Sequence, residues 1–213
     1  MKSLNEIDAR RVVQLLPKVV RENLVNEEGY KVFLGGGFIR EVISGGEPRD
    51  VDLFVDSKES ARTLRDKIRT EGDRVFKTDN AITIVRPVGL PIQIITRWLY
   101  SDAQRLAESF DYTVCQGVLW KEEGVWLSLV SDDFYADLAA KRLRYTTPDR
   151  EEAAGGSMLR ALRFTKRGYH IPPEELAKVI ARLVGDDAKA EDICANLREV
   201  DPLRLLAGEF VND

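Results

Sequence analysis

Hydrophobic positions at the start of the chain recur with the spacing of an amphipathic helix. Between Leu4 and Leu24, apolar residues return every three or four positions, which places them on one face of a helix. Pro17 interrupts this run, and proline inside a helix removes a backbone hydrogen bond. The pattern therefore predicts one or two short helices, which we take as a helical extension over residues 1–28.

The next stretch alternates between strand and helix patterns. An apolar run, YKVFLGG (30–36), stops at glycine and predicts a strand, and GFIREVISGG (37–46) then has helical spacing with its own glycine stop. DVDLFVD (50–56) alternates in the manner of a strand. The segment 57–72 predicts a helix that begins at Ser57, a favourable N-cap residue.

The segments RVFKT, AITIVRP and PIQIIT predict three more short strands between residues 74 and 96. Mixed helices and strands up to about residue 130 indicate an α+β fold around a twisted mixed sheet. From residue 149 the pattern is helical, with breaks at Gly168 and Gly185. We therefore predict a head domain over residues 1–147 and a small helical segment over residues 148–213.

Composition narrows the class of protein. The 213 residues are 44% hydrophobic and 32% charged, as expected for a chain that buries a real core. The formal charge is −4, so any contact with nucleic acid must be local. The sequence has two widely separated cysteines, no signal-peptide core and no apolar stretch that approaches about 18 residues. These features predict a cytoplasmic protein without a membrane partner. The sequence does not indicate an oligomeric state.

Three consecutive glycines, at positions 35 to 37, separate the first predicted strand from the helix after it. Backbone without Cβ atoms lets phosphate oxygens approach amide N–H groups, and the helix N-terminus favours an anion. Arg40, one turn into the helix, brings a guanidinium toward the same anion. The turn therefore predicts a phosphate site. A dinucleotide-binding fold is the alternative, but GGGFIREV lacks its G-x-G-x-x-G spacing.

Two aspartates, Asp50 and Asp52, lie two positions apart in the next predicted strand. Residues two apart in a strand project to the same side. Adjacent carboxylates repel each other unless a cation lies between them, and Mg²⁺ prefers such oxygen ligands together with substrate phosphates. The pair predicts a divalent-metal site. In the alternative interpretation, Asp50 caps a turn after Pro48 and Asp52 is a solvated strand residue.

The segment GGFIREVISGGEPRDVDLFV resembles the nucleotidyltransferase signature of CCA-adding enzymes and bacterial poly(A) polymerases, within the DNA polymerase beta-like superfamily. SFDYTVCQ is similar to that family's R-R-D-F-T-I-N-A segment, and MLRALRFTKRGYHIP is similar to its first neck helix. The residues that match the signature, with Glu41 at the family's usual Asp, are Gly36, Gly37, Arg40, Asp50, Asp52, Asp111 and Thr113.

The resemblance implies a nucleotidyltransferase head with a short helical neck. It also implies ATP or another nucleoside triphosphate as substrate, Mg²⁺ or Mn²⁺ as cofactor, and an RNA or tRNA-like acceptor. Asp50 and Asp52 would be the catalytic and metal-binding residues. The nucleotide-binding residues implied by the resemblance are Gly36, Gly37, Arg40, Asp111, Arg160 and Arg163.

The chain departs from the family pattern at the third carboxylate. Gln93 stands in IQIITRW where the family has an acidic residue, and a neutral amide is a weaker metal ligand that cannot act as a base. This departure leaves two alternatives open. One is a catalytically weakened nucleotide-binding or regulatory module, and the other is a toxin-like transferase that acts on protein or tRNA.

Further departures fall on the sugar-phosphate and base contacts. Ser109 and Phe110 replace a pair of arginines, and Cys115 replaces an asparagine. The base-selecting positions of CCA-adding enzymes fall on Ala153, Ala154 and Ser157, which lack the paired donors and acceptors needed to read a base. No segment after the neck-like helices resembles the family's body and tail. We therefore expect no CCA addition by this chain.

Overall fold

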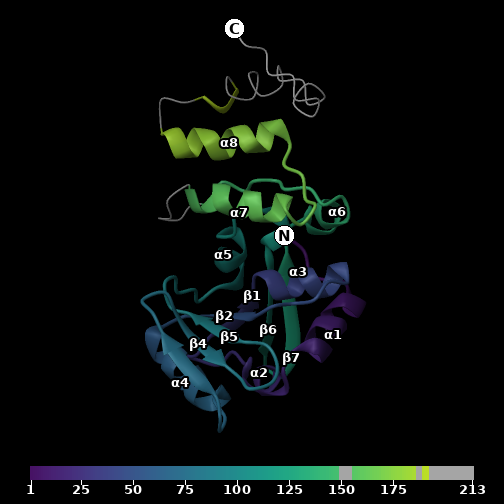
Figure 1. The fold of residues 1–213 in the computed structure, drawn as a ribbon. Helices are drawn as coiled ribbons and strands as arrows, with labels where there is room; N and C mark the ends of the chain where they lie inside the picture. Colours follow the sequence, from purple (N-terminus) through teal and green to yellow (C-terminus); the bar gives the residue numbers. More distant parts are fainter. Residues whose placement is uncertain (149–154, 186–188, 192–213) are drawn as a thin grey trace. The chain divides into compact units, whose positions relative to one another are not determined.

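The computed structural model describes residues 1–148, 155–185 and 189–191 (Figure 1). The chain divides into two compact units, Met1–Ala140 and Lys141–Asp213. Within the described residues, no helix combines the length and the hydropathy that crossing a membrane requires. The elements of the first unit are α1 (Glu6–Leu15), α2 (Lys18–Asn23), β1 (Val32–Gly35), α3 (Gly37–Ser44), β2 (Val51–Val55), α4 (Lys58–Ile68), β3 (Arg74–Lys77), β4 (Ala81–Val85), β5 (Ile92–Ile95), α5 (Ala103–Glu108), the 3₁₀ helix η1 (Thr113–Cys115), β6 (Gly117–Glu122), β7 (Val125–Val130) and α6 (Phe134–Ala139).

The N-terminal helices follow the prediction made from Pro17. The Asn5 side chain caps α1 by accepting the Asp8 backbone N–H at 2.8 Å, a common way to satisfy the first turn of a helix. The chain then breaks at Leu16 and Pro17, and α2 begins at the next residue. The helix predicted from Ser57 is also confirmed, because the Ser57 hydroxyl accepts the Ser60 N–H at 3.0 Å.

In the described part of the chain, seven strands form one sheet in the order β3-β4-β5-β2-β1-β6-β7. β2 and β5 run parallel, and the other neighbouring strands run antiparallel. The predicted α+β fold with a mixed sheet is confirmed, and Figure 1 shows the helices of the first unit, α1 to α6, around this sheet. The elements β6, β7, α5, η1 and α6 were not predicted individually, because the residue pattern between 101 and 136 indicates only mixed structure.

One face of the sheet packs against α4. Residues that pair directly across neighbouring strands project to the same side, so the register places Leu53, Ile94 and Ile82 in one row. All three are buried, and α4 contacts β2, β4 and β5. We call this side the α4 face. Its closed packing holds the strands that carry the candidate site.

The opposite side carries a second row, formed by Gly35, Asp52, Gln93, Thr83 and Phe76. We call it the Asp52 face. Its β1–β6–β7 part is covered by α5, and the buried residues of that cluster are Phe33, Phe54, Ala103, Leu106, Ala107 and Val118. Its β5–β4–β3 part is more open, since Gln93 and Thr83 are partly exposed and the exposed fraction of Phe76 is 52%.

The second unit contains α7 (Gly155–Thr165) and α8 (Pro173–Val184). The chain before α7 joins this unit, because the Leu143 N–H donates to the His170 carbonyl at 2.8 Å and the Tyr145 N–H donates to Glu175 Oε2 at 2.8 Å. The domain boundary between residues 147 and 148 stays a prediction. Of the expected base-selecting positions, Ser157 is buried on α7, while Ala153 and Ala154 lie outside the described residues.

Candidate nucleotide-binding site

The turn between β1 and α3 presents bare backbone to Asp52. Gly36 caps α3 with φ 74° and ψ −143°, a combination that is accessible almost only to glycine. A Cβ atom on Gly36 would lie 2.9 Å from Asp52 Oδ2. Gly36 is therefore fixed both by its backbone angles and by the carboxylate beside it. The first N–H groups of α3 have no partner inside the helix, so they remain available to an anion.

Asp52 lies on β2 directly across from Gly35, and Asp50 precedes the strand on the same side. The pKa of Asp52 is raised from 3.8 to about 7, chiefly by burial and also by the neighbouring Asp50 carboxylate, while Arg40 opposes the rise. Desolvation and a like charge both disfavour the ionised form. The pair therefore stores an electrostatic cost that a bound cation would relieve.

Gln93 occupies the position next to Asp52 on β5, and its Nε2 donates a hydrogen bond to Asp50 Oδ2 at 3.2 Å. The amide thus orients one of the two carboxylates. An acidic residue here would add a third negative charge to the pair. Replacement by an amide lowers the repulsion at the site and removes an anionic ligand.

Two carboxylates that share a face, one of them enclosed against a glycine, fit a hard divalent cation with oxygen ligands. Within residues 1–148, 155–185 and 189–191, however, no group of three or more His, Cys, Asp and Glu side chains is arranged to hold a metal ion. Asp50 and Asp52 would therefore supply only two protein carboxylates. Any remaining ligands would come from substrate phosphates and water.

Arg40 is buried one turn into α3, with an exposed fraction of 5%. Its Nη2 lies 2.8 Å and its Nε 3.2 Å from Glu41 Oε1, and its Nη1 approaches Cys115 Sγ at 3.5 Å. The guanidinium is therefore held by α3 itself and by η1. Its role as a direct nucleotide contact stays a prediction.

The segment before η1 is largely structural. The Ser109 hydroxyl donates to the Leu106 carbonyl at 2.7 Å, and the Phe110 ring lies edge-on to Phe54 with 5.7 Å between ring centroids. These two residues, which replace the family's arginines, therefore close α5 and pack the core. Asp111 follows them and is buried, with an exposed fraction of 4%. Its place beside a ribose stays a prediction.

Sequence reasoning missed one buried carboxylate. Asp137 on α6 is fully buried and accepts a hydrogen bond from Thr113 Oγ1 at 2.7 Å. The signal that could have found it is its place in the segment DLAAKRLRY, within an otherwise apolar helix. Thr113 is thus fixed by α6. Arg160 and Arg163 lie on α7 in the second unit, and their role in nucleotide binding stays a prediction.

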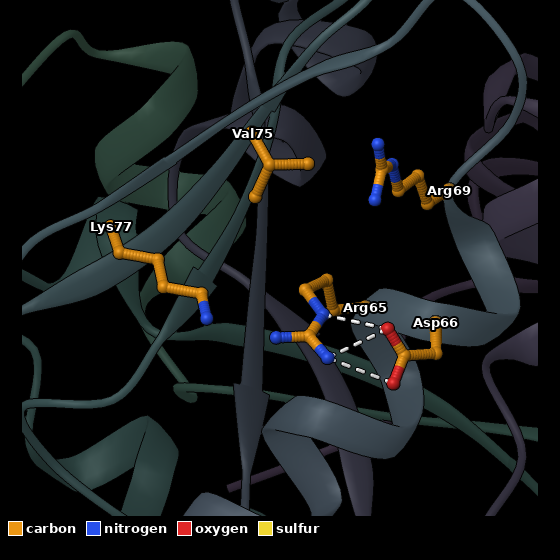
Figure 2. A pocket seen from close by; sticks show the side chains of 5 residues that line it. All are labelled: Arg65, Asp66, Arg69, Val75 and Lys77. Carbon is orange, nitrogen blue, oxygen red and sulfur yellow. Dashed lines mark hydrogen bonds and ion pairs between the residues drawn. The ribbon is translucent and has the colours of Figure 1, made fainter.

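A cavity of about 480 Å³ lies away from this site, between α4 and β3. It is lined by Arg65, Asp66, Arg69, Val75 and Lys77, and Figure 2 shows the cationic groups around a common space. Val75 and Lys77 are on the α4 face, because Lys77 pairs with Ile82 and Val75 with Ile84. The cavity is therefore separate from Asp52.

Comparison with solved structures defines the class of fold. The Thermotoga maritima CCA-adding enzyme complexed with tRNA superposes with a TM-score of 0.57 at 16% identity, covering 100% of this chain and 57% of that enzyme. CCA-adding enzyme complexes with CTP and ATP give TM-scores of 0.60 and 0.61 at 19% and 20% identity, covering 97% of this chain and 54% and 49% of theirs. The fold is that of a CCA-adding enzyme head domain.

Sequence comparison then gives the family. The family model described as "Gad2: Gabija anti-defense 2 family protein" matches residues 6–141. The chain therefore belongs to this family. A curated relative named Gabija anti-defense 2, from Bacillus phage SPbetaL7, is 24% identical over 151 residues, which are 70% of this chain and 36% of that protein. The chain thus spans about a third of this relative. The expected likeness to CCA-adding enzymes is confirmed for the fold. By sequence, however, the chain belongs to the Gabija anti-defense 2 family.

Proposed function

We propose that this chain is a metal-dependent nucleotidyltransferase that moves a nucleoside monophosphate from a nucleoside triphosphate to a hydroxyl acceptor. One observation carries the proposal: the Asp52 carboxylate lies against Gly36, at the N-terminus of α3, with Asp50 on the same side. This arrangement brings anion-binding backbone and metal-binding carboxylates together. The nucleotidyltransferase-like fold supports the same chemistry.

Each group has a distinct task in this reaction. The N-terminal N–H groups of α3 bind the triphosphate, with Gly36 and Gly37 leaving room for its oxygens. Arg40, fixed by Glu41, lowers the cost of negative charge at Asp52. Asp50 and Asp52 hold Mg²⁺ or Mn²⁺, which when bound stabilises charge on the attacking and leaving oxygens.

The transfer itself is an in-line displacement. The acceptor oxygen forms a bond to the α-phosphorus, the bond between the α-phosphorus and the bridging oxygen of the β-phosphate breaks, and pyrophosphate leaves with the electron pair. The Gln93 amide cannot accept the hydroxyl proton, so the proton passes to the Asp50 carboxylate or to water. We therefore expect slow transfer, since a positioned base commonly contributes about 10²- to 10⁴-fold in rate.

The biological setting follows from the family. The curated relative is named for counteracting a Gabija defence, and we propose that this chain does the same by modifying a target with a nucleotide. The CCA-adding enzymes of similar fold are complexed with ATP, CTP or tRNA, which supports a nucleotide donor and an RNA or tRNA-like acceptor here.

A second candidate function is favoured by Gln93. Because its amide donates to Asp50, the site is stabilised without a third carboxylate. Such a site suits a nucleotide-binding or regulatory module that binds a metal–nucleotide complex without turnover. A toxin-like transferase that modifies protein or tRNA keeps the chemistry and changes only the acceptor.

Calorimetry with each nucleoside triphosphate and Mg²⁺ or Mn²⁺ tests the binding step. The double variant Asp50→Asn, Asp52→Asn should lose metal-dependent binding, whereas Asp79→Asn, at an exposed bend, should bind as the natural protein does. Equal affinity in the double variant and the natural protein would contradict the proposal.

Labelled nucleotide incubated with cell extract tests the transfer step. Label on RNA supports the nucleotidyltransferase with an RNA acceptor, and label on protein supports the toxin-like alternative. Binding that depends on Asp50 and Asp52 without any transfer supports the regulatory module.

A further inference from the structure

Phe76 lies on the Asp52 face at the open edge of the sheet. The register runs from Asp52 to Gln93, then Thr83, then Phe76, one residue per strand. With roughly 4.8 Å between neighbouring strands, Phe76 lies about 14 Å from Asp52 along this row. A short single-stranded end bound at Phe76 therefore spans the distance to the carboxylates.

The direction of attack, which rests on the proposed function, also places the acceptor on the Phe76 side of Asp52. In an in-line displacement, the attacking and leaving oxygens lie on opposite sides of the α-phosphorus. The triphosphate side is β1 and α3, because Gly36 adjoins Asp52 from there. The acceptor hydroxyl must then approach from the β5 side. Gln93, Thr83 and Phe76 are the residues of the row on that side.

The Phe76 side chain is exposed to solvent. Its exposed fraction is 52%, and it takes part in no ring contact with a described residue. Arg74 projects to the same side two positions earlier and is also exposed. An exposed aromatic ring beside a guanidinium is the combination with which proteins stack the bases of single-stranded nucleic acid.

The other side of the same edge strand is cationic. Lys77 and Arg69 line the cavity in Figure 2 and act on Asp66 only through longer-range electrostatics, whereas Arg65 is bound to Asp66 through contacts of 2.7 and 2.8 Å. Between residues 58 and 77 there are seven Lys and Arg residues against four Asp and Glu, in a chain whose formal charge is −4. This local excess favours a polyanion over a neutral or basic protein partner.

We propose that the β3 edge binds the acceptor, and that the acceptor is the end of a single-stranded nucleic acid. One base stacks on Phe76 on the Asp52 face, and backbone phosphates pass over the edge of β3 to Arg69 and Lys77. The terminal hydroxyl then lies beyond Gln93, facing the nucleotide. A protein acceptor is the competing occupant, since an exposed phenylalanine also serves as an apolar anchor.

Binding of fluorescein-labelled single-stranded dodecamers, followed by anisotropy, tests the stacking step. Phe76→Ala and Phe76→Leu should both weaken binding about tenfold, and Phe76→Trp should retain it, because stacking needs a π-face rather than apolar area. Val88→Ala removes an apolar side chain with an exposed fraction of 89% and is the matched control. RNA and DNA dodecamers of one sequence distinguish the two sources of the acceptor. Equal binding by all Phe76 variants would overturn the assignment.

The salt dependence of binding tests the interaction with phosphates. Removing Arg69 and Lys77 together should flatten the plot of log affinity against log salt by roughly 0.7 for each phosphate that is no longer neutralised. An unchanged slope would remove both residues from the interface. Absence of dodecamer binding by the natural protein, together with a crosslink from position 76 to a protein, would replace the nucleic acid with a protein acceptor.

Calorimetry of the same variants with Mg²⁺ and nucleotide separates this inference from the proposed function. The Phe76 variants should bind nucleotide as the natural protein does, because the ring lies on the acceptor side. Nucleotide binding without dodecamer binding overturns only the acceptor surface. Dodecamer binding that depends on Phe76, without metal-dependent nucleotide binding, overturns only the nucleotidyltransferase.

Discussion

The Asp52 face has two parts that obey different constraints. On the β1–α3 side, a Cβ atom on Gly36 would lie 2.9 Å from Asp52 Oδ2, and Gly36 adopts backbone angles that other residues rarely adopt. On the β5–β4–β3 side, Gln93 and Thr83 are partly exposed and Phe76 projects into solvent. The first part cannot accept even one more carbon atom, whereas the second can change its side chains with little effect on packing. The sequence matches the nucleotidyltransferase signature of CCA-adding enzymes on the first side, at Gly36 and Asp52, and departs from it on the second, at Gln93.

The largest effect is expected for Gly36→Ala, which breaks the closed side. The added Cβ would lie 2.9 Å from Asp52 Oδ2. Alanine would also have to adopt φ 74° and ψ −143°, at a cost of about 1–3 kcal/mol in stability. Displacement of Asp52 should lower metal–nucleotide affinity at least about 100-fold, since a misplaced ligand abolishes the site. Calorimetry and chemical denaturation measure the two effects.

Gly45→Ala is the matched control for this variant. Gly45 also has a positive φ, 75°, but a Cβ there meets nothing within 4 Å. It should lose about 1 kcal/mol in stability and keep its nucleotide affinity. A similar loss of affinity in both variants would mean that backbone strain, and not contact with Asp52, decides the result.

Gln93→Glu tests the open side by restoring a third carboxylate. Transfer to a bound RNA acceptor should rise roughly tenfold or more at saturating nucleotide, because an added anionic ligand and base accelerates the chemical step. Single-turnover kinetics of both forms measure the change. A fast natural protein whose rate does not rise in the variant would show that another group completes the site.

The same substitution has a second readout without activity. Loss of the hydrogen bond from Gln93 to Asp50 and the addition of a third charge should destabilise the metal-free protein by about 1 kcal/mol. Added Mg²⁺ should reduce this difference in thermal unfolding. Equal stability of the two metal-free forms would indicate that the three side chains are not close in solution.

Asp52→Asn should stabilise the metal-free protein at high pH. Because the folded state raises the pKa of Asp52 from 3.8 to about 7, the stability associated with its protonated form is lost as the pH rises from about 4 to above 7. Asparagine removes that loss, so the gain should be on the order of 4 kcal/mol at pH 8 and near zero at pH 4. Denaturant unfolding at both pH values measures it, and a gain that is larger at pH 4 would contradict the raised pKa.

The smallest effect is expected for Cys115→Ser. Sulfur is a weak acceptor, and the distance from Arg40 Nη1 to Cys115 Sγ is 3.5 Å. Arg40 stays fixed by Glu41, so nucleotide affinity should change by less than about twofold. Calorimetry that showed a tenfold loss would mean that η1, rather than α3, determines the position of the guanidinium.

Local sequence rules predicted the elements around the site. The break at Pro17, the N-cap at Ser57 and the glycine turn after β1 depend on backbone dihedral angles and on hydrogen bonds within a few residues. The shared side of Asp50 and Asp52 follows from the period of a strand. These features were therefore readable before any long-range contact was known.

Register and packing decided the rest, because they depend on which distant segments meet. The resemblance assigned Gln93 to the position of the third carboxylate, but its register directly across from Asp52, and the place of Phe76 at the end of the same row, follow from strand pairing. The rise in the pKa of Asp52 requires burial in the folded chain and proximity to Asp50. The structural tasks of Ser109 and Phe110, and the buried bond from Thr113 to Asp137, likewise arise only when α5, η1 and α6 close on the sheet. The sequence by itself thus determined which groups could do chemistry, while the tertiary structure determined their neighbours, since solvation and proximity are properties of the folded chain.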